Sequence, residues 1–278
     1  MMRPNVVILH ATGTNRDRDV AWAVELADGQ PVILHINELR IRPGRLHDFQ
    51  MLVLPGGFSY GDALGAGRLW ASDLRWLLQD ELARFVESGK PILGICNGFQ
   101  ALVKSGWLPW PPSHNSLHPA GSASDLDTGP LDTSRDIGGA TLTRNASNRF
   151  ECRWVWLQFD AFSPCVFTHG LVEQIYCPVA HGEGRFVLSE GKLERLRAQR
   201  QVALTYVRAD GSPAAYPDNP NGSFADIAGV CNERGNILGL MPHPENHIVP
   251  EQHPRWMTEQ GNLGLPLFVA GIRYAARL

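Results

Sequence analysis

The stretch PILGICNGFQALVKSG, from Pro91 to Gly106, joins a short apolar run to an amphipathic one, with Cys96 at the junction. The run PILGI predicts a buried strand, and the segment Asn97 to Ser105 predicts a helix. Gly94 and Gly98 stand two positions on either side of the cysteine, as in the strand-to-helix corner that lifts a nucleophile out of an α/β sheet. The pattern predicts that Cys96 is a nucleophile on a strained turn.

The predicted position of Cys96 also favours reactivity. A helix N-terminus presents free amides and the positive end of a dipole. Both stabilise a thiolate and so lower the pKa of a cysteine below its ordinary value of about 8.5. A buried structural role is the common one for a lone cysteine, and the paired glycines favour catalysis over it. The remaining cysteines are widely spaced and form no C-x-x-C pair, so we expect neither a disulfide framework nor a metal site: Cys152, Cys165, Cys177 and Cys231.

Strands and helices alternate on both sides of this corner. Short β-branched runs separated by helices indicate a parallel sheet covered on both faces. We therefore expect an α/β fold, doubly wound and flavodoxin-like, with a mostly parallel central sheet, helices on both faces and additional strands in the second half. In the first half, the predicted strands are Asn5 to His10, Pro31 to Ile36 and Met51 to Pro55, and the helices are about Asp17 to Leu26 and Ser72 to Val86.

The second half is richer in strands. They are predicted at Cys152 to Phe159, Ile175 to Ala180 and Val202 to Val207, followed by a hairpin around Glu233-Arg234-Gly235 and a helix of about Leu265 to Arg277. A segment rich in Pro, Ser, Asp and Gly, at about 111–139, predicts a surface-loop insertion. Nothing divides two cores, so residues 1–278 are expected to form a single domain.

Composition limits the possible partners. Hydrophobic residues make up 44% of the 278 residues, charged residues make up 19%, and the formal net charge is -3. These values are ordinary for a globular protein and give no electrostatic reason to expect nucleic acid or a membrane surface. No run approaches the roughly 18 apolar residues of a membrane helix, so a cytoplasmic location is expected.

A thiolate that attacks an amide needs a base, and the sequence offers two H-x-E candidates. In His243-Pro244-Glu245 the proline stiffens the pair, and side chains two positions apart in extended backbone face the same way. Glu245 is then placed to orient the imidazole of His243. In His181-Gly182-Glu183 the glycines on both sides of Glu183 leave it loose, so His243 is preferred.

A glycine-rich segment follows the predicted strand MLVLP. Gly57-Phe58-Ser59-Tyr60-Gly61 matches the serine hydrolase pattern G-x-S-x-G, but more glycines follow at once and no helix starts where that corner requires one. The segment suits another role, because glycine amides at the carboxyl edge of a sheet can stabilise an oxyanion. We expect the amides of Gly57 and Asn97 to form a two-donor oxyanion hole.

Several stretches together resemble one family. LPGGFSYGD, GICNGFQAL, NASNRFECRWV, VAHGEGR, YPDNPNGS and GLMPHPENH are similar to the glutaminase subunit of phosphoribosylformylglycinamidine synthase, a triad-type glutamine amidotransferase. The resemblance covers nearly the whole chain outside the insertion and implies the class I glutamine amidotransferase fold. It implies Cys96 as nucleophile, His243 as general base and acid, and Glu245 as its orienting residue. It also implies that Gln100 helps to seat glutamine, with Arg149, Phe150 and Glu151 lining the same pocket.

The resemblance further implies partners. Such proteins hydrolyse L-glutamine through a γ-glutamyl thioester and pass ammonia to a large ATP-using synthetase subunit, often with a small third subunit. This chain contains no G-x-x-x-x-G-K-[ST] phosphate loop, so we expect no cofactor in it, with ATP and magnesium on the synthetase. The alternatives are a stand-alone cysteine amidase with the same corner and a silent amidotransferase-like scaffold.

One position departs from the family pattern. The loop after the first strand usually carries a cysteine, in G-S-N-C-D, whereas this chain has Gly13-Thr14-Asn15-Arg16-Asp17. The predicted triad is not affected, and the departure leaves open how the partner docks.

Overall fold

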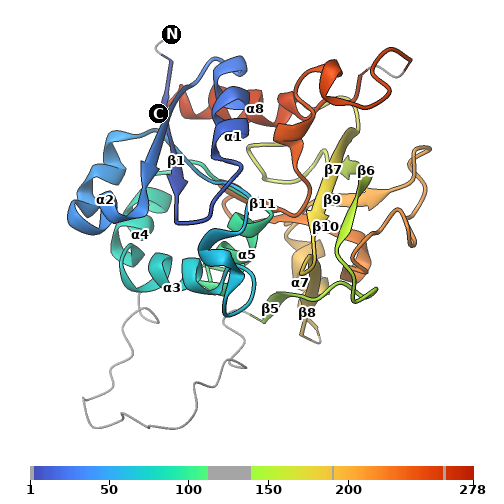
Figure 1. The fold of residues 1–278 in the computed structure, drawn as a ribbon, viewed down its shortest axis with the longest axis horizontal. Helices are drawn as coiled ribbons and strands as arrows, with labels where there is room; N and C mark the ends of the chain where they lie inside the picture. Colours follow the sequence, from blue (N-terminus) through green and yellow to red (C-terminus); the bar gives the residue numbers. More distant parts are fainter. Residues whose placement is uncertain (1–2, 112–138, 190, 259–260) are drawn as a thin grey trace, which may run out of the picture.

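A nine-stranded sheet forms the centre of the protein (Figure 1). The structure is a computed structural model that describes residues 3–111, 139–189, 191–258 and 261–278. The strands of this sheet are β1 Asn5–His10, β2 Gln30–His35, β3 Met51–Leu54, β4 Ile92–Ile95, β6 Glu151–Phe159, β7 Ile175–His181, β9 Val202–Val207, β10 Ile227–Cys231 and β11 Ile237–Leu240. Their spatial order is β2-β1-β3-β4-β11-β10-β9-β6-β7.

The sheet changes character along this order. Every pairing from β2 to β11 is parallel, and every pairing from β11 to β7 is antiparallel. The two parts join at the hairpin of β10 and β11, which was predicted from the turn at Glu233-Arg234-Gly235. The doubly wound parallel sheet with additional strands in the second half is therefore confirmed.

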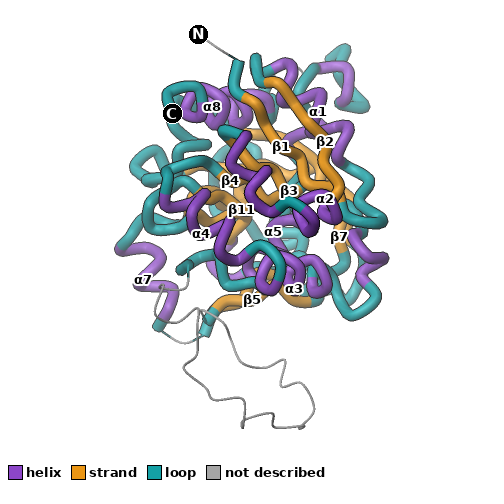
Figure 2. The backbone as a smooth tube through the Cα atoms, turned by 90° about the vertical axis from the view of Figure 1, so that its left-hand side faces the viewer, coloured by secondary structure: helices purple, strands orange, loops and turns teal. Residues whose placement is uncertain are grey.

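Helices cover both faces of the parallel part. They are α1 Asp17–Leu26, α2 Ile36–Ile41, α3 Arg68–Trp76, α4 Gln79–Glu87, α5 Asn97–Lys104 and α8 Leu265–Ala275. A further helix, α7 Lys192–Ala198, precedes β9 and lies beside the antiparallel part (Figure 1). Helices α1 and α8 lie side by side against β1, β2 and β3 (Figures 1 and 2). Helix α5 packs on β3, β4 and β11 from the other side, with α3 against it.

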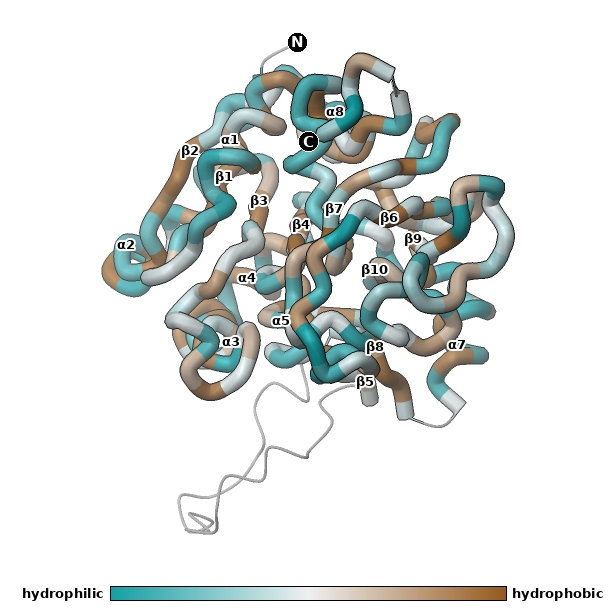
Figure 3. The backbone as a smooth tube through the Cα atoms, turned by 45° about the vertical axis from the view of Figure 1, so that its right-hand side comes forward, coloured by the Kyte–Doolittle hydropathy of each residue, from teal (hydrophilic) through white to brown (hydrophobic). Residues whose placement is uncertain are grey.

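The core lies where these layers meet. All residues of β3, β4 and β11 are buried, and the central residues of β1, Val6 to Leu9, have no exposed surface. Figure 3 shows β2, β3 and β4 as mostly hydrophobic stretches between more polar connections. Such continuous apolar strands are typical of parallel sheets that are covered on both faces.

Two predictions about the elements need correction or extension. The single helix predicted at about Ser72 to Val86 is wrong, because α3 ends at Trp76 and α4 begins at Gln79, with Leu78 outside helical geometry between them. A separate two-stranded sheet of β5 Ala140–Thr143 and β8 Arg185–Leu188 was not foreseen. Most of the predicted insertion at about 111–139 lies outside the described residues, and the single-domain organisation stays a prediction.

None of the helices within the described residues is both long enough and apolar enough to cross a bilayer.

Candidate active site

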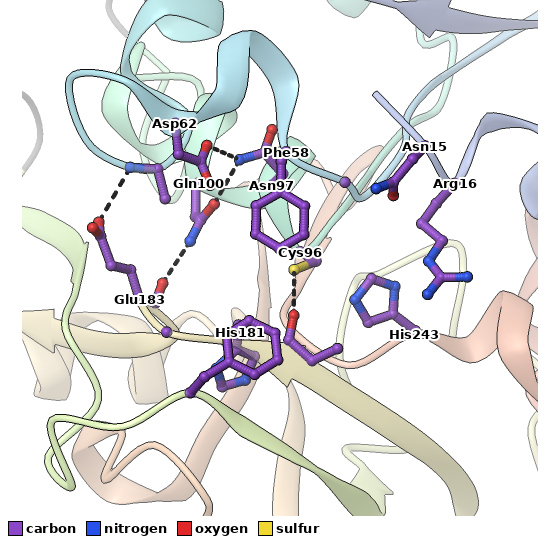
Figure 4. Close-up of a pocket in the computed structure, with 15 residues that line it drawn as sticks. Asn15, Arg16, Phe58, Asp62, Cys96, Asn97, Gln100, His181, Glu183 and His243 are labelled. Atoms are coloured by element: carbon purple, nitrogen blue, oxygen red, sulfur yellow. Dashed lines mark hydrogen bonds between the residues drawn. The ribbon is translucent and has the colours of Figure 1, made fainter. Parts of the chain in front are cut away.

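The carboxyl ends of β1, β3, β4 and β11 meet at one edge of the sheet, and the connections that follow them enclose a pocket (Figure 4). Open α/β sheets bind ligands at this edge. Strand β7, from the antiparallel part, closes the opposite wall with its last residues. The lining residues are Asn15, Arg16, Gly57, Phe58, Asp62, Ala66, Cys96, Asn97, Gln100, Phe150, Ala180, His181, Gly182, Glu183 and His243.

Cys96 stands at the corner that the glycine spacing predicted. Its φ of 48° and ψ of −103° lie outside the ordinary regions for a side-chain-bearing residue, so the corner is strained. Its amide donates to Leu240 O of β11 at 2.8 Å, which fixes the backbone to the neighbouring strand. The Sγ atom lies 3.9 Å from Ala180 O, at the floor of the pocket.

The corner requires glycine at both flanking positions, because a side chain at either would collide with neighbouring atoms. A Cβ on Gly98 would lie 2.0 Å from Leu54 O of β3, and a Cβ on Gly94 would lie 2.5 Å from Cδ1 of Leu102 in α5. Strand β4 and helix α5 therefore approach each other and β3 as closely as the backbone allows. The glycine spacing seen in the sequence is the steric requirement of this approach.

His243 and Glu245 reach the pocket from the segment after β11. His243 N donates to Pro178 O of β7 at 2.8 Å, and its Nδ1 lies 2.7 Å from Glu245 Oε1. Because a carboxylate only accepts, Nδ1 carries the proton and Nε2 is the nitrogen left for chemistry. That Nε2 is buried and has no hydrogen-bond partner in the described part of the chain.

The charge state of His243 follows from its neighbours. Burial disfavours the imidazolium, but the carboxylate of Glu245 and the charge of Cys96 outweigh it and raise the pKa of His243 to about 10. The His243 side chain is 4% exposed and that of Glu245 is fully buried, so solvent screens the pair little. The arrangement suits an imidazolium that gives its Nε2 proton to a leaving group in the pocket.

Gly56 sets the position of the imidazole. A Cβ at this residue would lie 2.6 Å from His243 Cε1 and 3.4 Å from Cys96 Cβ. The backbone between β3 and the pocket therefore packs directly against both side chains. No signal in the sequence distinguished Gly56 from Gly57, which was the glycine that we singled out.

The predicted oxyanion donors both line the pocket. Asn97 is the first residue of α5, so its amide has no carbonyl partner within the helix. Gly57, with a φ of 115°, follows β3 on the same wall. The side chain of Asn97 joins the two segments, since its Oδ1 accepts from Ser59 N at 3.2 Å and its Nδ2 donates to Asp62 Oδ1 at 2.9 Å.

His181, the rival base, also lines the pocket, but both of its ring nitrogens are engaged. Nδ1 lies 3.2 Å from Asn145 Oδ1, and Nε2 lies 3.5 Å from Asn221 Nδ2. Burial, together with the nearby charge of His243, lowers the pKa of His181 to about 3. A neutral ring with both nitrogens occupied is suited to structure, and this geometry favours His243 as the base.

The same network explains two of the family-like stretches. Asn145 belongs to NASNRFECR and Asn221 to YPDNPNGS, and both amides are buried beside His181. Asn145 Nδ2 donates to His181 O at 2.8 Å, and Ala146 N donates to Asn221 O at 2.9 Å. The two stretches therefore meet behind the pocket wall.

Only some of the residues predicted to seat glutamine line the pocket. Gln100 is buried and lines the pocket, where its Nε2 donates to Glu183 O at 2.6 Å. Phe150 lines the mouth, with its ring stacked on that of Phe58 at a centroid distance of 6.5 Å. Arg149 and Glu151 are not among the lining residues; Glu151 is buried, and its carboxylate accepts from Ser147 and Arg153.

Several lining residues were not predicted as part of the site, among them Asn15, Arg16, Phe58, Asp62 and Glu183. Asn15 and Arg16 follow β1, whose carboxyl end abuts that of β3, and this sheet position was the signal that could have located them. Glu183 was set aside because glycines flank it. Its carboxylate is fixed, however, since Oε2 accepts from Ala66 N at 3.3 Å.

The serine of the G-x-S-x-G match has no catalytic geometry. Ser59 is 2% exposed and its hydroxyl is hydrogen-bonded to Thr14 Oγ1 at 2.8 Å. A short 3-10 segment, Ser59–Asp62, follows, and the next α-helix, α3, begins only at Arg68, so the strand-to-helix corner of a serine hydrolase is absent from this described segment.

Comparisons with known proteins agree with this geometry. The model of the CobB/CobQ-like glutamine amidotransferase domain matches residues 3–275. The phosphoribosylformylglycinamidine synthase subunit PurQ of Treponema denticola is 46% identical, over 98% of this chain and 99% of that protein. The PurQ subunit of Dehalococcoides mccartyi is 42% identical over the full length of both.

A solved structure gives the same assignment. A chain of the PurLQS structure from Thermotoga maritima superposes with a TM-score of 0.69 at 30% identity, covering 98% of this chain and 99% of that chain. The chain described here belongs to the CobB/CobQ-like glutamine amidotransferases and, among them, to the PurQ family.

Proposed function

We propose that this chain is the glutaminase subunit of phosphoribosylformylglycinamidine synthase. It hydrolyses L-glutamine and supplies ammonia to the synthetase subunit, which converts phosphoribosylformylglycinamide to phosphoribosylformylglycinamidine in purine biosynthesis. The observation that carries the proposal is the pocket that holds Cys96 on its strained corner opposite the His243–Glu245 pair. Relatives named PurQ that align over the full chain support the same function.

The first half of the reaction forms a thioester. The Cys96 thiolate attacks the γ-carbonyl carbon of glutamine, and the carbonyl oxygen becomes an oxyanion that the Gly57 and Asn97 amides are placed to stabilise. When the carbon–nitrogen bond breaks, His243 Nε2 gives its proton to the leaving nitrogen, which departs as ammonia. The γ-glutamyl group is then held on Sγ, and His243 is neutral.

The second half releases glutamate. His243 Nε2 takes a proton from water, and the water oxygen attacks the thioester carbon. The carbon–sulfur bond breaks, Cys96 leaves as a thiolate, and the new carboxyl group loses its proton to solvent. Glu245 stays a carboxylate throughout and stabilises the imidazolium at each stage.

The wider assembly follows from this role. We propose that ATP and magnesium bind the synthetase subunit, since this chain carries no phosphate loop. The Thermotoga maritima assembly named PurLQS supports a complex with a synthetase, and we extend this to a small third subunit.

The test is glutamine-dependent synthesis. Cognate synthetase and this chain should together form phosphoribosylformylglycinamidine from glutamine, whereas the synthetase alone should form it only from ammonium. Cys96→Ser should abolish the glutamine-dependent reaction and leave the ammonium-dependent one intact. The proposal fails if adding this chain with glutamine yields no product under conditions where ammonium does.

A further inference from the structure

The carboxylate of Glu245 is placed by the backbone that carries it. In the described part of the chain, its Oε1 is hydrogen-bonded to His243 Nδ1, and its Oε2 is buried without a partner. The imidazole is therefore the one group that its side chain holds within the described residues, and the position of the carboxylate depends on the turn Pro244–Asn246. What fixes this turn also fixes the carboxylate against the imidazole.

Two other segments of the chain hold the turn. From the segment that follows it, Gln252 Nε2 donates to Glu245 O at 3.3 Å. From the turn itself, Asn246 Nδ2 donates to Asp19 Oδ2 at 3.1 Å, across 227 positions of sequence. The main chain of Asn246 is bound to the base, because its N donates to His243 O at 3.1 Å. Asn246 thus connects His243 to Asp19.

Asp19 lies on a rigid part of the fold. It belongs to the first turn of α1, where Val20 N donates to Arg16 O at 3.1 Å. Helix α1 packs on β1, β2 and α8 and against the turn Pro244–Asn246. Side chains on packed helices hold their partners more precisely than side chains on loops. Asp19 is therefore a fixed anchor for a turn that lies in a connection.

The same oxygen of Asp19 also holds Arg16. Asp19 Oδ2 accepts from Arg16 Nη1 at 3.0 Å, and Arg16 lines the pocket on the side of His243 (Figure 4). One carboxylate oxygen thus joins the pocket wall to the catalytic turn. The Arg16 and Asp19 side chains are 42% and 35% exposed, and ion pairs this exposed contribute little to stability. The arrangement therefore matters more for position than for the free energy of unfolding.

Building on the proposed function, we infer that Asp19 is a positioning residue for the glutaminase reaction. It anchors the turn Pro244–Asn246 through Asn246 and so keeps the imidazole of His243 and the carboxylate of Glu245 in register with Cys96. Asp19 touches no reacting atom and acts through Asn246. A carboxylate in the first turn of a helix also interacts favourably with the helix dipole, and that role would affect stability and not turnover.

The first test separates kcat from KM in the complex with cognate synthetase, with glutamate release as the assay. Asp19→Ala should lower kcat roughly 10- to 100-fold, because the turn is no longer held and the imidazole is displaced. KM should stay near the wild-type value, since Asp19 is not a lining residue of the pocket. Asn246→Ala breaks the same link, leaves the pair of Arg16 and Asp19 intact, and should lower kcat to a similar extent.

Asp160→Ala is the matched control. Asp160 also accepts from an arginine, Arg200 Nη1 at 3.1 Å, and from a second donor, Phe162 N at 2.9 Å, and its side chain is 29% exposed. It follows the end of β6 that lies away from the pocket. This variant should keep the wild-type kcat. A wild-type kcat in Asp19→Ala or in Asn246→Ala, or an equal loss in Asp160→Ala, would overturn the inference.

A charge exchange tests the link itself. Asn246→Asp places two carboxylates against each other and should lower kcat at least as much as Asp19→Ala. The double variant Asp19→Asn/Asn246→Asp restores the hydrogen bond with donor and acceptor exchanged, and its kcat should return to within roughly 10-fold of the wild type. A role confined to the dipole of α1 predicts no recovery, because the helix has then lost its charge. A double variant as slow as Asn246→Asp would refute the inference.

A second readout does not depend on turnover. In proton NMR of the full chain, the hydrogen on His243 Nδ1 should give a low-field signal, assigned by its loss in His243→Ala. The signal should be sharp in the wild type and in Asp160→Ala, and broadened by exchange with water in Asp19→Ala. If the wild-type complex released no glutamate from glutamine, the proposed function would fail, and this signal would still decide the role of Asp19; an identical signal in wild type and Asp19→Ala would refute it.

Discussion

The Nδ1 atom of His243 lies 2.7 Å from Oε1 of Glu245, and only Pro244 separates the two residues in the chain. The backbone turns after His243 into a short 3-10 segment, Pro244–Asn246, and this turn brings the carboxylate within hydrogen-bond distance of the imidazole. One oxygen of Glu245 orients the ring, and the other, Oε2, is buried without a partner in the described residues. The negative charge of Glu245 is therefore directed at His243.

Glu245→Gln should show what this charge does. The variant keeps a side-chain oxygen as acceptor but removes the carboxylate, so the pKa of His243 should fall from about 10 toward or below its ordinary value. NMR titration of the His243 ring measures this directly. Glutaminase activity should drop by roughly 10²- to 10⁴-fold, because the imidazolium is no longer stabilised. An unchanged pKa would contradict the assigned role of Glu245.

The same shift has a consequence for stability. A histidine whose pKa is raised on folding stabilises the folded state fully below the unfolded pKa of about 6.5 and loses that contribution as the pH rises through the folded value. The difference in free energy of unfolding between wild type and Glu245→Gln, measured by urea denaturation, should be largest near pH 6 and shrink toward pH 10. A difference that grew with pH would have the wrong sign.

Gly56→Ala should lower kcat solely by displacing the imidazole of His243. The new methyl group would lie 2.6 Å from His243 Cε1, so the imidazole must move away from its place opposite Cys96. A displacement of this size costs roughly 100-fold in kcat. Gly44→Ala is the matched control, since a Cβ there meets nothing within 4 Å, and its kcat should equal that of the wild type. Full activity in Gly56→Ala would show that the imidazole position is not critical.

Asn145→Ala should mainly affect stability. The buried amide of Asn145 donates to Arg149 O and His181 O and accepts from Gly184 N, and truncation leaves these groups unpaired. We expect a loss of about 3 kcal/mol in the free energy of unfolding, measured by urea denaturation. Asn37→Ala, at an exposed position of α2, should change it by less than about 0.5 kcal/mol. Equal effects of the two substitutions would mean that the network contributes nothing.

The parallel half of the fold could be predicted because its signals are local. Each buried strand is a continuous apolar run, and the spacing of Gly94 and Gly98 indicates the Cys96 corner. The break between α3 and α4 could not, because Trp70, Leu74, Leu78 and Leu82 keep the helical spacing of buried residues straight across it. The spacing of apolar residues shows which face of a helix is buried, but it does not show whether the helix is continuous.

The rest of the pocket could not be predicted because distant parts of the chain supply it. His181 ends β7 and Glu183 follows it, at the far antiparallel edge of the sheet, whereas Arg16 lies on the connection after β1. Glycines beside Glu183 suggested a loose side chain, whereas in the folded protein Gln100 donates to its backbone carbonyl and Ala66 N donates to its carboxylate. Such contacts depend on the complete sheet order, which no local pattern specifies.

The central claim is that Cys96 carries the γ-glutamyl group between the two halves of the reaction. Acid quenching of the complex with its synthetase during glutamine turnover, followed by mass spectrometry of the Cys96 peptide, tests it directly. The account predicts a γ-glutamyl adduct on Cys96 in the wild type, more of it in a variant that releases glutamate slowly, and none in Cys96→Ser. Steady glutamate production with the adduct on another residue, or with activity retained in Cys96→Ser, would contradict it.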